Sequence, residues 1–447
     1  MEDLMVSEQR SSTSGKGVPA GFKLTEVGVI PQDWECVPFG SLFKTNIKKI
    51  NVSDHEQVSF IGMQDVSEDA KLKNSTLLPF KEVKSGFTYF EKGDVLLAKI
   101  TPCFENGKGC HTAELPTSVG FGSTEFHVLR ENEDSDSRFI YFWTTEKKLR
   151  SSLEAEMVGS AGHRRVPLAA IKTYLIPCPK TRKEQRAIAD TLSDVGDFII
   201  ASEKLIAKKQ AIKTATMQQL LTGKTRLSKF ALHKDGSVKG YKKCEQGEIP
   251  VDWCYTDFGK LFEPIINKKA IDSSEELSFI GMQDVSESAK LSTYSLINKR
   301  DIKSGLTYFE RGDVLVAKIT PCFENGKGCY TQTLTTNIGY GSTEFHVLRA
   351  KPNADPQFIY YWTTDIHFRS TLKAEMVGSA GHKRVPFHAI QAYKIPCPEN
   401  KEEQTAIATI LSDMDKEIQT LQQRLDKTRQ LKQGMMQELL TGKTRLI

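Results

Sequence analysis

The sequence lacks long apolar runs, since no stretch approaches the ~18 consecutive apolar residues that a membrane-spanning helix needs. The first residues, MEDLMVSEQRSSTSGKGVPAG, also lack the charged-then-apolar order of a secretory signal peptide. We therefore expect a soluble, cytoplasmic protein. Because residues 1–19 are rich in Ser, Gly and charge, we expect them to form a disordered tail.

Cysteine pairs are lacking as well. The chain of 447 residues has nine cysteines, an odd number, and no CxxC pair, which favours reduced thiols over a disulfide framework. Cys103 and Cys110 recur as Cys322 and Cys329, but the one nearby histidine, at position 111, becomes tyrosine in the second occurrence. We therefore predict buried thiols and no metal site.

Signatures of common enzyme classes are missing. The chain has no GxSxG, HExxH or NPP-aromatic motif, and no glycine fingerprint that would bind a dinucleotide or S-adenosylmethionine. TGKT occurs twice and resembles part of a phosphate-binding loop, but Gln218 and Gln437 stand where that loop needs a glycine. Because each TGKT follows a helical pattern, we interpret it as a helix end with Gly223 or Gly442 in the left-handed conformation. The sequence gives no grounds for an enzyme.

The sequence does contain a nearly complete internal repeat. SFIGMQDVSE at 59–68 recurs unchanged at 278–287, and AKITPCFENGKGC at 98–110 recurs at 317–329, both at an offset of 219 positions. The chain is therefore a duplication without insertion or deletion. We expect a first globular domain at 20–180, a helix at 181–222, a connector at 223–243, a second globular domain at 244–398, and a second helix with a C-terminal tail at 399–447.

Each repeat ends in a long amphipathic stretch without proline, at 184–221 and at 403–440. Apolar residues recur every three or four positions, which predicts a single helix of roughly 57 Å with the narrow seam of a two-stranded coiled coil. Only an antiparallel arrangement pairs both seams fully, and it returns the C-terminus to the first domain and creates a pseudo-two-fold axis. The expected seam residues are Ile188, Leu192, Val195, Ile199, Ile206, Ile212 and Leu220, then Ile407, Leu411, Met414, Ile418, Leu421, Leu425, Leu431, Met435 and Leu439.

The globular domains have mixed patterns. VSFIGM, DVLLAKI and EFHVLR predict short strands, whereas residues 137–153 carry Phe139, Phe142, Trp143 and Leu149 at helical spacing. The expected fold class is therefore α+β, with two similar mixed α/β domains separated by two long antiparallel coiled-coil helices.

Long glycine-rich loops carry the concentrated positive charge of these domains, although the net charge is only +5. Loops of such length are usually functional. Basic side chains beside glycine amides suit phosphate contacts, while Asn, Arg and an exposed aromatic ring suit the reading of base edges. The candidate DNA-binding residues are Lys99, Phe104, Asn106, Lys108, His163, Arg164 and Arg165, and in the second repeat Lys318, Phe323, Asn325, Lys327, His382, Lys383 and Arg384.

The order of motifs carries a family resemblance. Each half opens with KLTEVGVIPQDWECVPFGSLF or YKKCEQGEIPVDWCYTDFGKLF, continues with GDVLLAK or GDVLVAK, and then has GSAGHRRVP or GSAGHKRVP, an IPCP stretch and EQxxIAxxLSD. After residue 20, this succession resembles the specificity subunit of Type I restriction-modification systems. The resemblance implies two target-recognition domains, each binding one half of a bipartite sequence in double-stranded DNA. Those domains are normally dissimilar, whereas here they are close copies.

The resemblance further implies a non-catalytic subunit without a cofactor of its own. Two modification subunits would supply S-adenosylmethionine-dependent adenine methylation, and restriction (motor-nuclease) subunits would supply cleavage that needs ATP and Mg. Because the CFENGKG loops are identical, we expect a near-palindromic target. The alternative is a non-catalytic scaffold whose duplicated domains bind protein, and DNA affinity that falls steeply with salt would discriminate the two.

Overall fold

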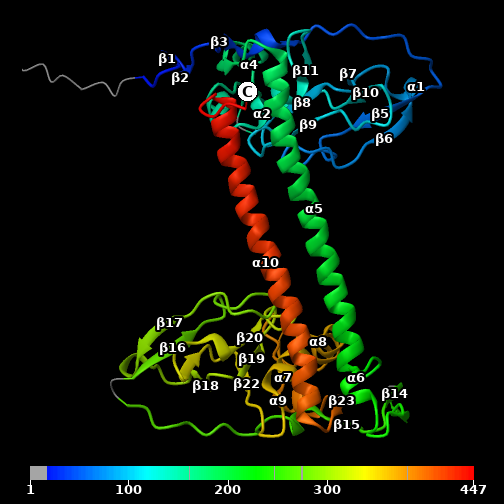
Figure 1. Cartoon of the computed structure of the whole chain (residues 1–447), viewed down its shortest axis with the longest axis vertical. Coiled ribbons are helices and arrows are strands. Elements are labelled where there is room, and N and C mark those ends of the chain that lie inside the picture. Colours follow the sequence, from blue (N-terminus) through cyan, green and yellow to red (C-terminus); the bar gives the residue numbers. More distant parts are fainter. Residues whose placement is uncertain (1–17, 161, 246, 273–274, 380, 447) are drawn as a thin grey trace, which may run out of the picture. The chain divides into compact units, whose positions relative to one another are not determined.

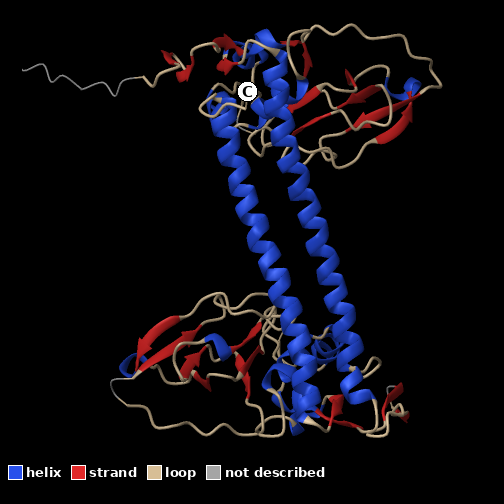
Figure 2. Cartoon of the chain, viewed as in Figure 1, coloured by secondary structure: helices blue, strands red, loops and turns tan. Residues whose placement is uncertain are grey.

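A computed structural model describes residues 18–446 except 161, 246, 273–274 and 380. The chain divides into two compact units, one formed by the residues up to Ser202 together with those from Arg424 onward (unit 1), and one formed by Glu203–Gln423 (unit 2). Each unit combines short strands with helices (Figures 1 and 2), so the predicted mixed α/β character of two similar domains is confirmed. The expected tail at 1–19 lies almost wholly outside the described residues.

Unit 1 contains two four-stranded sheets, in the orders β6-β5-β10-β7 and β4-β11-β8-β9, and two small sheets, β1-β2 and β12-β3. The central strand β8 is buried along its whole length between β11 and β9, which explains its uninterrupted apolar sequence VLLA. The elements of this unit are β1 (Phe22–Thr25), β2 (Gly28–Pro31), β3 (Glu35–Pro38), η1 (Phe39–Leu42), β4 (Phe43–Lys44), β5 (Gln57–Ile61), β6 (Thr76–Pro79), α1 (Phe80–Val83), β7 (Thr88–Glu91), β8 (Val95–Ala98), β9 (Gly109–His111), β10 (Val119–Gly122), β11 (Phe126–Glu131), α2 (Ser137–Thr145), α3 (Lys147–Ala155), α4 (Leu168–Thr173), β12 (Leu175–Cys178) and the first half of α5 (Arg182–Leu221).

Unit 2 repeats this plan with sheets in the orders β17-β16-β21-β18, β20-β19-β22, β13-β14 and β15-β23. In both units the parallel pair joins equivalent strands, β5 with β10 and β16 with β21. The elements are α6 (Ser228–Ala231), β13 (Tyr241–Cys244), β14 (Gly247–Pro250), β15 (Trp253–Asp257), η2 (Phe258–Lys260), β16 (Glu276–Ile280), β17 (Ser295–Asn298), η3 (Lys299–Asp301), β18 (Thr307–Glu310), β19 (Val314–Ala317), β20 (Gly328–Tyr330), η4 (Thr331–Thr333), β21 (Ile338–Gly341), β22 (Phe345–Leu348), α7 (Pro356–Thr364), α8 (Ile366–Ala374), α9 (Phe387–Ala392), β23 (Lys394–Pro398) and the first half of α10 (Lys401–Leu440).

The stretch 137–153 is helical as expected, and it is divided into two helices. Helix α2 ends at Thr145, and Glu146 adopts an extended conformation and caps α3 by accepting a hydrogen bond from the amide of Leu149 at 2.7 Å. The equivalent Asp365 separates α7 from α8 in unit 2. Helices α2 and α3 both contribute buried apolar side chains to one core.

The long helices α5 and α10 each span 40 residues. Each is divided between the units, so unit 1 also contains the second half of α10 and unit 2 also contains the second half of α5. Ile212 and Leu431, which the sequence places in the seam, are exposed at 42% and 59%, so that part of the seam prediction is wrong. A straight helix has 3.6 residues per turn, and its buried stripe therefore drifts away from a strict heptad spacing. In unit 2 the next residue, Lys213, contacts α10 in place of Ile212, and its ammonium group pairs with Asp415 at 2.8 Å.

The segment that follows each long helix packs against a tryptophan. Gly442 and Gly223 both have a φ of 71°, which confirms the predicted left-handed helix ends. In unit 1 a Cβ at Gly442 would lie 2.6 Å from Pro31 and 3.0 Å from Trp34, so the C-terminal segment lies at the N-terminal edge of that unit, as expected. Gly223 meets the proline and tryptophan of unit 2 at the same distances.

The nine cysteines are free thiols, and Cys110 and Cys329 are buried as predicted, whereas Cys103 and Cys322 are only half-buried. Burial raises the pKa of the Cys110 thiol to about 12. Among the helices that the structure describes, none is both long and apolar enough to cross a membrane.

Candidate DNA interface

Two glycine-rich loops and the short turn after β10 meet at one face of unit 1. The amide of Thr101 donates to the carbonyl of Arg164 at 3.0 Å, and the amide of Val166 donates to the carbonyl of Lys99 at 2.8 Å. The Lys99 amide in turn donates to Glu125 at 2.9 Å. The loops 99–108, 123–125 and 158–165 therefore form one surface, which we call the loop face.

Unit 2 has an equivalent loop face built from the same backbone contacts. The amide of Thr320 donates to Lys383 at 2.9 Å, that of Val385 to Lys318 at 2.8 Å, and that of Lys318 to Glu344 at 2.9 Å. Partial burial lowers the pKa of Lys318. The loops identified from the sequence thus come together in both repeats.

Arg165 and Arg384 are the best-positioned cations of the loop faces. Arg165 donates to both carboxylate oxygens of Glu125, from Nε at 3.0 Å and from Nη2 at 2.7 Å. Arg384 binds Glu344 in the same two-pronged way, at 2.9 and 2.8 Å. The hydrogen bond from Arg165 holds the pKa of the Glu125 carboxyl below its ordinary value. Because the two groups fit as a fork, the carboxylate fixes the plane of a guanidinium that is still 46% exposed.

Lys108 and Asn106 have partners within the protein, a feature that their charge and polarity did not reveal. The ammonium group of Lys108 donates to the carbonyl of Met63 at 2.8 Å, as Lys327 does to Met282. The amide of Asn106 donates to Glu68 at 3.3 Å, and the corresponding bond from Asn325 to Glu287 measures 2.9 Å. These side chains therefore attach the loop 62–68, or its copy, to the loop face.

The residues at 164 and 383 differ between the repeats. Arg164 lies 3.5 Å from Glu105, whereas Glu324, the equivalent carboxylate, pairs with Lys373 at 3.1 Å. The side chain of Lys383 is exposed, as are His163 and His382. This is the clearest difference in charge pairing between the two loop faces.

Phe104 and Phe323 are not exposed, and the prediction that they read bases is wrong. They are 1% and 0% exposed, and each belongs to the hydrophobic core of its unit. The guanidinium of Arg150 lies 5.1 Å from the centre of the Phe104 ring, and that of Arg369 lies 5.5 Å from the Phe323 ring. Burial lowers the pKa of Arg150 to about 10. Because the flanking residues of this loop are polar, its sequence looks exposed although its aromatic ring turns inward.

Glu125 and Glu344, which bind Arg165 and Arg384, were not among the candidates predicted from the sequence. Their signal was present, because both lie in the repeated GSTEFHVLR segment. Positive charge guided the prediction of these loops, and a carboxylate that orients an arginine carries the opposite charge.

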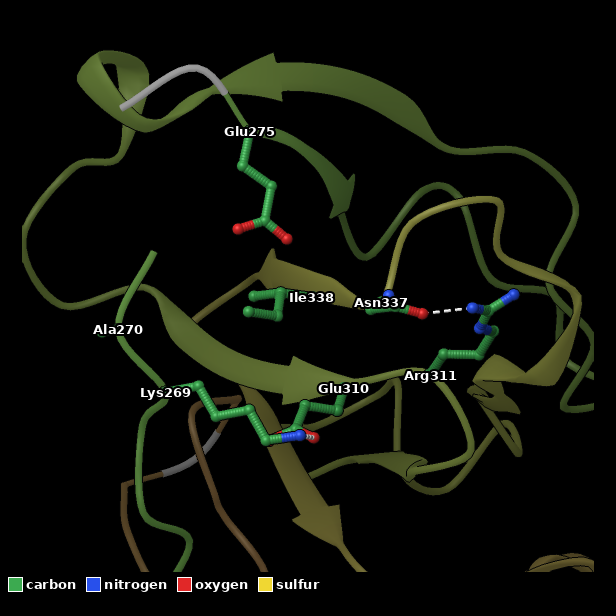
Figure 3. A pocket seen from close by; sticks show the side chains of 7 residues that line it. All are labelled: Lys269, Ala270, Glu275, Glu310, Arg311, Asn337 and Ile338. Atoms are coloured by element: carbon green, nitrogen blue, oxygen red, sulfur yellow. Dashed lines mark hydrogen bonds and ion pairs between the residues drawn. The ribbon is translucent and has the colours of Figure 1, made fainter. Parts of the chain in front are cut away.

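A pocket in unit 2 is a weaker candidate (Figure 3). Two of its cations already have partners within the pocket, since Lys269 binds the Glu310 carboxylate at 2.5 Å and Arg311 donates to the Asn337 side chain. The first repeat has Ile50 and Ser118 where this pocket has Lys269 and Asn337, so the pocket is not a shared feature. Its lining residues are Lys269, Ala270, Glu275, Glu310, Arg311, Asn337 and Ile338.

Comparison with known sequences gives two matches to one family model. The model of the Type I restriction modification DNA specificity domain matches residues 31–214 and 250–429. The chain is 36% identical over 167 residues to the EcoAI specificity subunit of Escherichia coli, a match that covers 36% of this chain and 27% of that relative. It is 24% identical over 434 residues to the putative MjaX specificity subunit of Methanocaldococcus jannaschii, covering 95% and 97% of the two chains.

Solved structures share the fold. The S subunit of a Type I restriction-modification system from M. genitalium has a TM-score of 0.53 at 13% identity, covering 94% of this chain and 98% of that one. A chain from a study of complex assembly and conformational transition in the type I R-M system also has a TM-score of 0.53, at 17% identity, covering 93% and 99%. Because one family match falls in each repeat and the two together include most of the sequence, the chain belongs to the Type I restriction-modification DNA specificity family.

Proposed function

We propose that this chain is the DNA sequence-specificity subunit of a Type I restriction-modification complex. The duplicated loop face, in which a carboxylate orients an exposed arginine, carries the proposal together with family membership. Each recognition domain, at 20–180 and 244–398, binds one half of a bipartite target in double-stranded DNA. The subunit has no catalytic role. Modification subunits bring S-adenosylmethionine, and restriction subunits bring ATP and Mg.

The long helices act as the spacer between the half-sites in this proposal, paired antiparallel along their seams. Support comes from each unit separately. In unit 1 Ile188, near the start of α5, shares a core with Leu439, near the end of α10. In unit 2 Leu220, near the end of α5, shares a core with Ile407, near the start of α10. This meeting of opposite helix ends in both units is expected of an antiparallel pair with a pseudo-two-fold axis. That axis would relate two modification subunits, one bound to each half.

The two half-sites are near-copies related by inversion. The arginine–glutamate fork, the attachment by lysine and the buried aromatic ring recur with the same geometry in both loop faces. Identical side chains held identically contact the same base edges. Any difference between the half-sites maps to the changed positions, of which Arg164 and Lys383 are the ones that carry charge on the loop face.

The test combines sequencing and binding. Sequencing of modified bases in cells that carry the complex should give a split motif with near-inverted halves. Duplex affinity should fall with log salt in proportion to the phosphates contacted. Arg165→Ala or Arg384→Ala should cost about 1 to 3 kcal/mol of binding free energy and relax specificity in one half-site.

Matched controls are Lys180→Ala and Lys394→Ala. Each removes an exposed cation from an ion pair on the small sheet beside the long helices, with Glu35 or with Asp257, and not on a loop face. They should leave DNA affinity unchanged. A scaffold that binds protein would show no sequence preference and no steep salt dependence, and unrelated half-sites would contradict the near-palindrome.

A further inference from the structure

Val158 and Val377 are exposed in a way that the fold does not require. Each is 63% exposed, the largest value for an apolar side chain that both repeats share within the described residues. The other such pair with equal exposure, Leu77 and Leu296, is at 49% on an edge strand that is not part of the loop face. An exposed valine among charged residues is therefore a feature of both loop faces.

Backbone hydrogen bonds place Val158 directly opposite Arg165. The amide of Val158 donates to the Arg165 carbonyl at 3.0 Å, and the Arg165 amide donates back at 2.8 Å. Directly opposite residues of an antiparallel pair project from the same side, with Cβ atoms about 5 Å apart. Val377 and Arg384 exchange the same two bonds at 3.0 and 2.9 Å. A branched apolar side chain thus stands next to the oriented guanidinium in each repeat.

Several exposed positions outside the loop faces have diverged between the repeats. Lys73 is replaced by Ser292, and Glu114 by Thr333, although all four are exposed. The valine, the arginine beside it and the glutamate that orients the arginine are all unchanged. Because a valine cannot bind phosphate or donate a hydrogen bond, its suitable partner on DNA is an apolar group. In the major groove that group is the 5-methyl of thymine.

We propose that Val158 and Val377 are specificity-determining residues that contact the 5-methyl group of a thymine beside the base read by Arg165 or Arg384. Arginine pairs best with the O6 and N7 atoms of guanine, so each half-site contains a guanine next to a thymine of either strand. This inference rests on the proposed function. It adds the identity of two adjacent positions in each half-site.

The test removes the methyl group from the DNA before any residue is changed. Once the modified motif is known, each thymine of a duplex target is replaced in turn by deoxyuridine, and affinity for the complete complex is measured. Replacing one particular thymine in each half-site should weaken binding of the complex about fourfold, because burying one methyl group contributes about that much to affinity. The double variant Val158→Ala/Val377→Ala should bind the thymine and deoxyuridine duplexes equally, while Leu77→Ala/Leu296→Ala should keep the wild-type preference.

Two results would overturn the inference and leave the proposed function intact: sequence-specific binding in which no deoxyuridine weakens affinity, or a valine variant that keeps the full preference. A motif without adjacent guanine and thymine would do the same. If the wild-type complex binds every sequence alike, the proposed function fails, and the inference fails with it.

Discussion

The pair of arginines that follow the long helices gives a prediction with an internal control. In unit 2 the guanidinium of Arg226 binds Asp252 at 2.8 Å and Glu403 at 2.8 Å, and the indole of Trp253 donates to Glu403 at 3.2 Å. The side chains of Arg226 and Glu403 are only 3% and 4% exposed. In unit 1 Arg445 takes the same position, but it is 31% exposed.

The two truncations should therefore differ in cost. Arg226→Ala leaves the Glu403 carboxylate buried without its cation, which costs about 3 to 5 kcal/mol of stability. Arg445→Ala should cost less than that, because the arginine is 31% exposed and water replaces part of its interaction, although its partner Glu184 is itself only 7% exposed. Adding Glu403→Gln to Arg226→Ala should recover part of the loss, since a neutral amide can still accept the hydrogen bond from Trp253.

Hydrogen exchange read peptide by peptide separates the two units within the intact chain. Arg226→Ala should speed exchange in β14 and β15, and Arg445→Ala should speed exchange in β2 and β3 to a smaller extent. Equal effects from the two arginines would refute the reasoning from burial. So would an Arg226→Ala variant whose exchange matches the wild type, or a Glu403→Gln addition that destabilises further.

Three further predictions address the core, the pH response and the duplication. Phe104→Ala should lower the free energy of unfolding in urea by about 3 to 5 kcal/mol and leave the DNA affinity of the folded protein unchanged. A variant that loses DNA affinity but keeps its stability would show that Phe104 contacts DNA after all. Burial lowers the pKa of His111 to about 4, whereas the pKa of an unfolded histidine is near 6.5. Between these two pH values the unfolded state binds more protons than the folded state, so the stability of unit 1 falls as the pH falls. His111→Tyr, the residue of the second repeat, should make that decline shallower, which exchange in unit 1 between pH 7 and 4.5 would show. A fragment of residues 20–228 should pair with itself through its seam and direct methylation to a perfect palindrome, and a monomer by light scattering would contradict this.

The strands and the long helices could be predicted because the apolar residues of each segment indicate its structure. The repeat could be predicted because two segments have nearly the same sequence. The strand β8 is an example, since VLLA reads as buried from its composition alone. The break at Glu146 could not be predicted in the same way, because neither proline nor glycine marks it. The break depends on one carboxylate that accepts a hydrogen bond from a backbone amide at the start of α3. A single contact of this kind produces no repeating pattern in the sequence.

The loop face was predictable as a cluster but not residue by residue. Irregular loops have no period, so nothing in the segment around Phe104 tells which side chains turn inward. The lysine and asparagine of the same loop were chosen for their charge and polarity, yet Lys108 holds a neighbouring loop through its hydrogen bond to Met63. Only the tertiary partners separate Arg165, which is oriented and exposed, from these attachment residues.

The division of the chain into units has a consequence for synthesis. Unit 2 is a continuous segment, Glu203–Gln423, whereas the core of unit 1 includes Leu439 and Leu440 from the end of the chain. A ribosome therefore completes the second unit before the first has all of its core residues, although domains generally fold from the N-terminus during translation. The domain that is made first therefore lacks part of its core until the second half of α10 has been made.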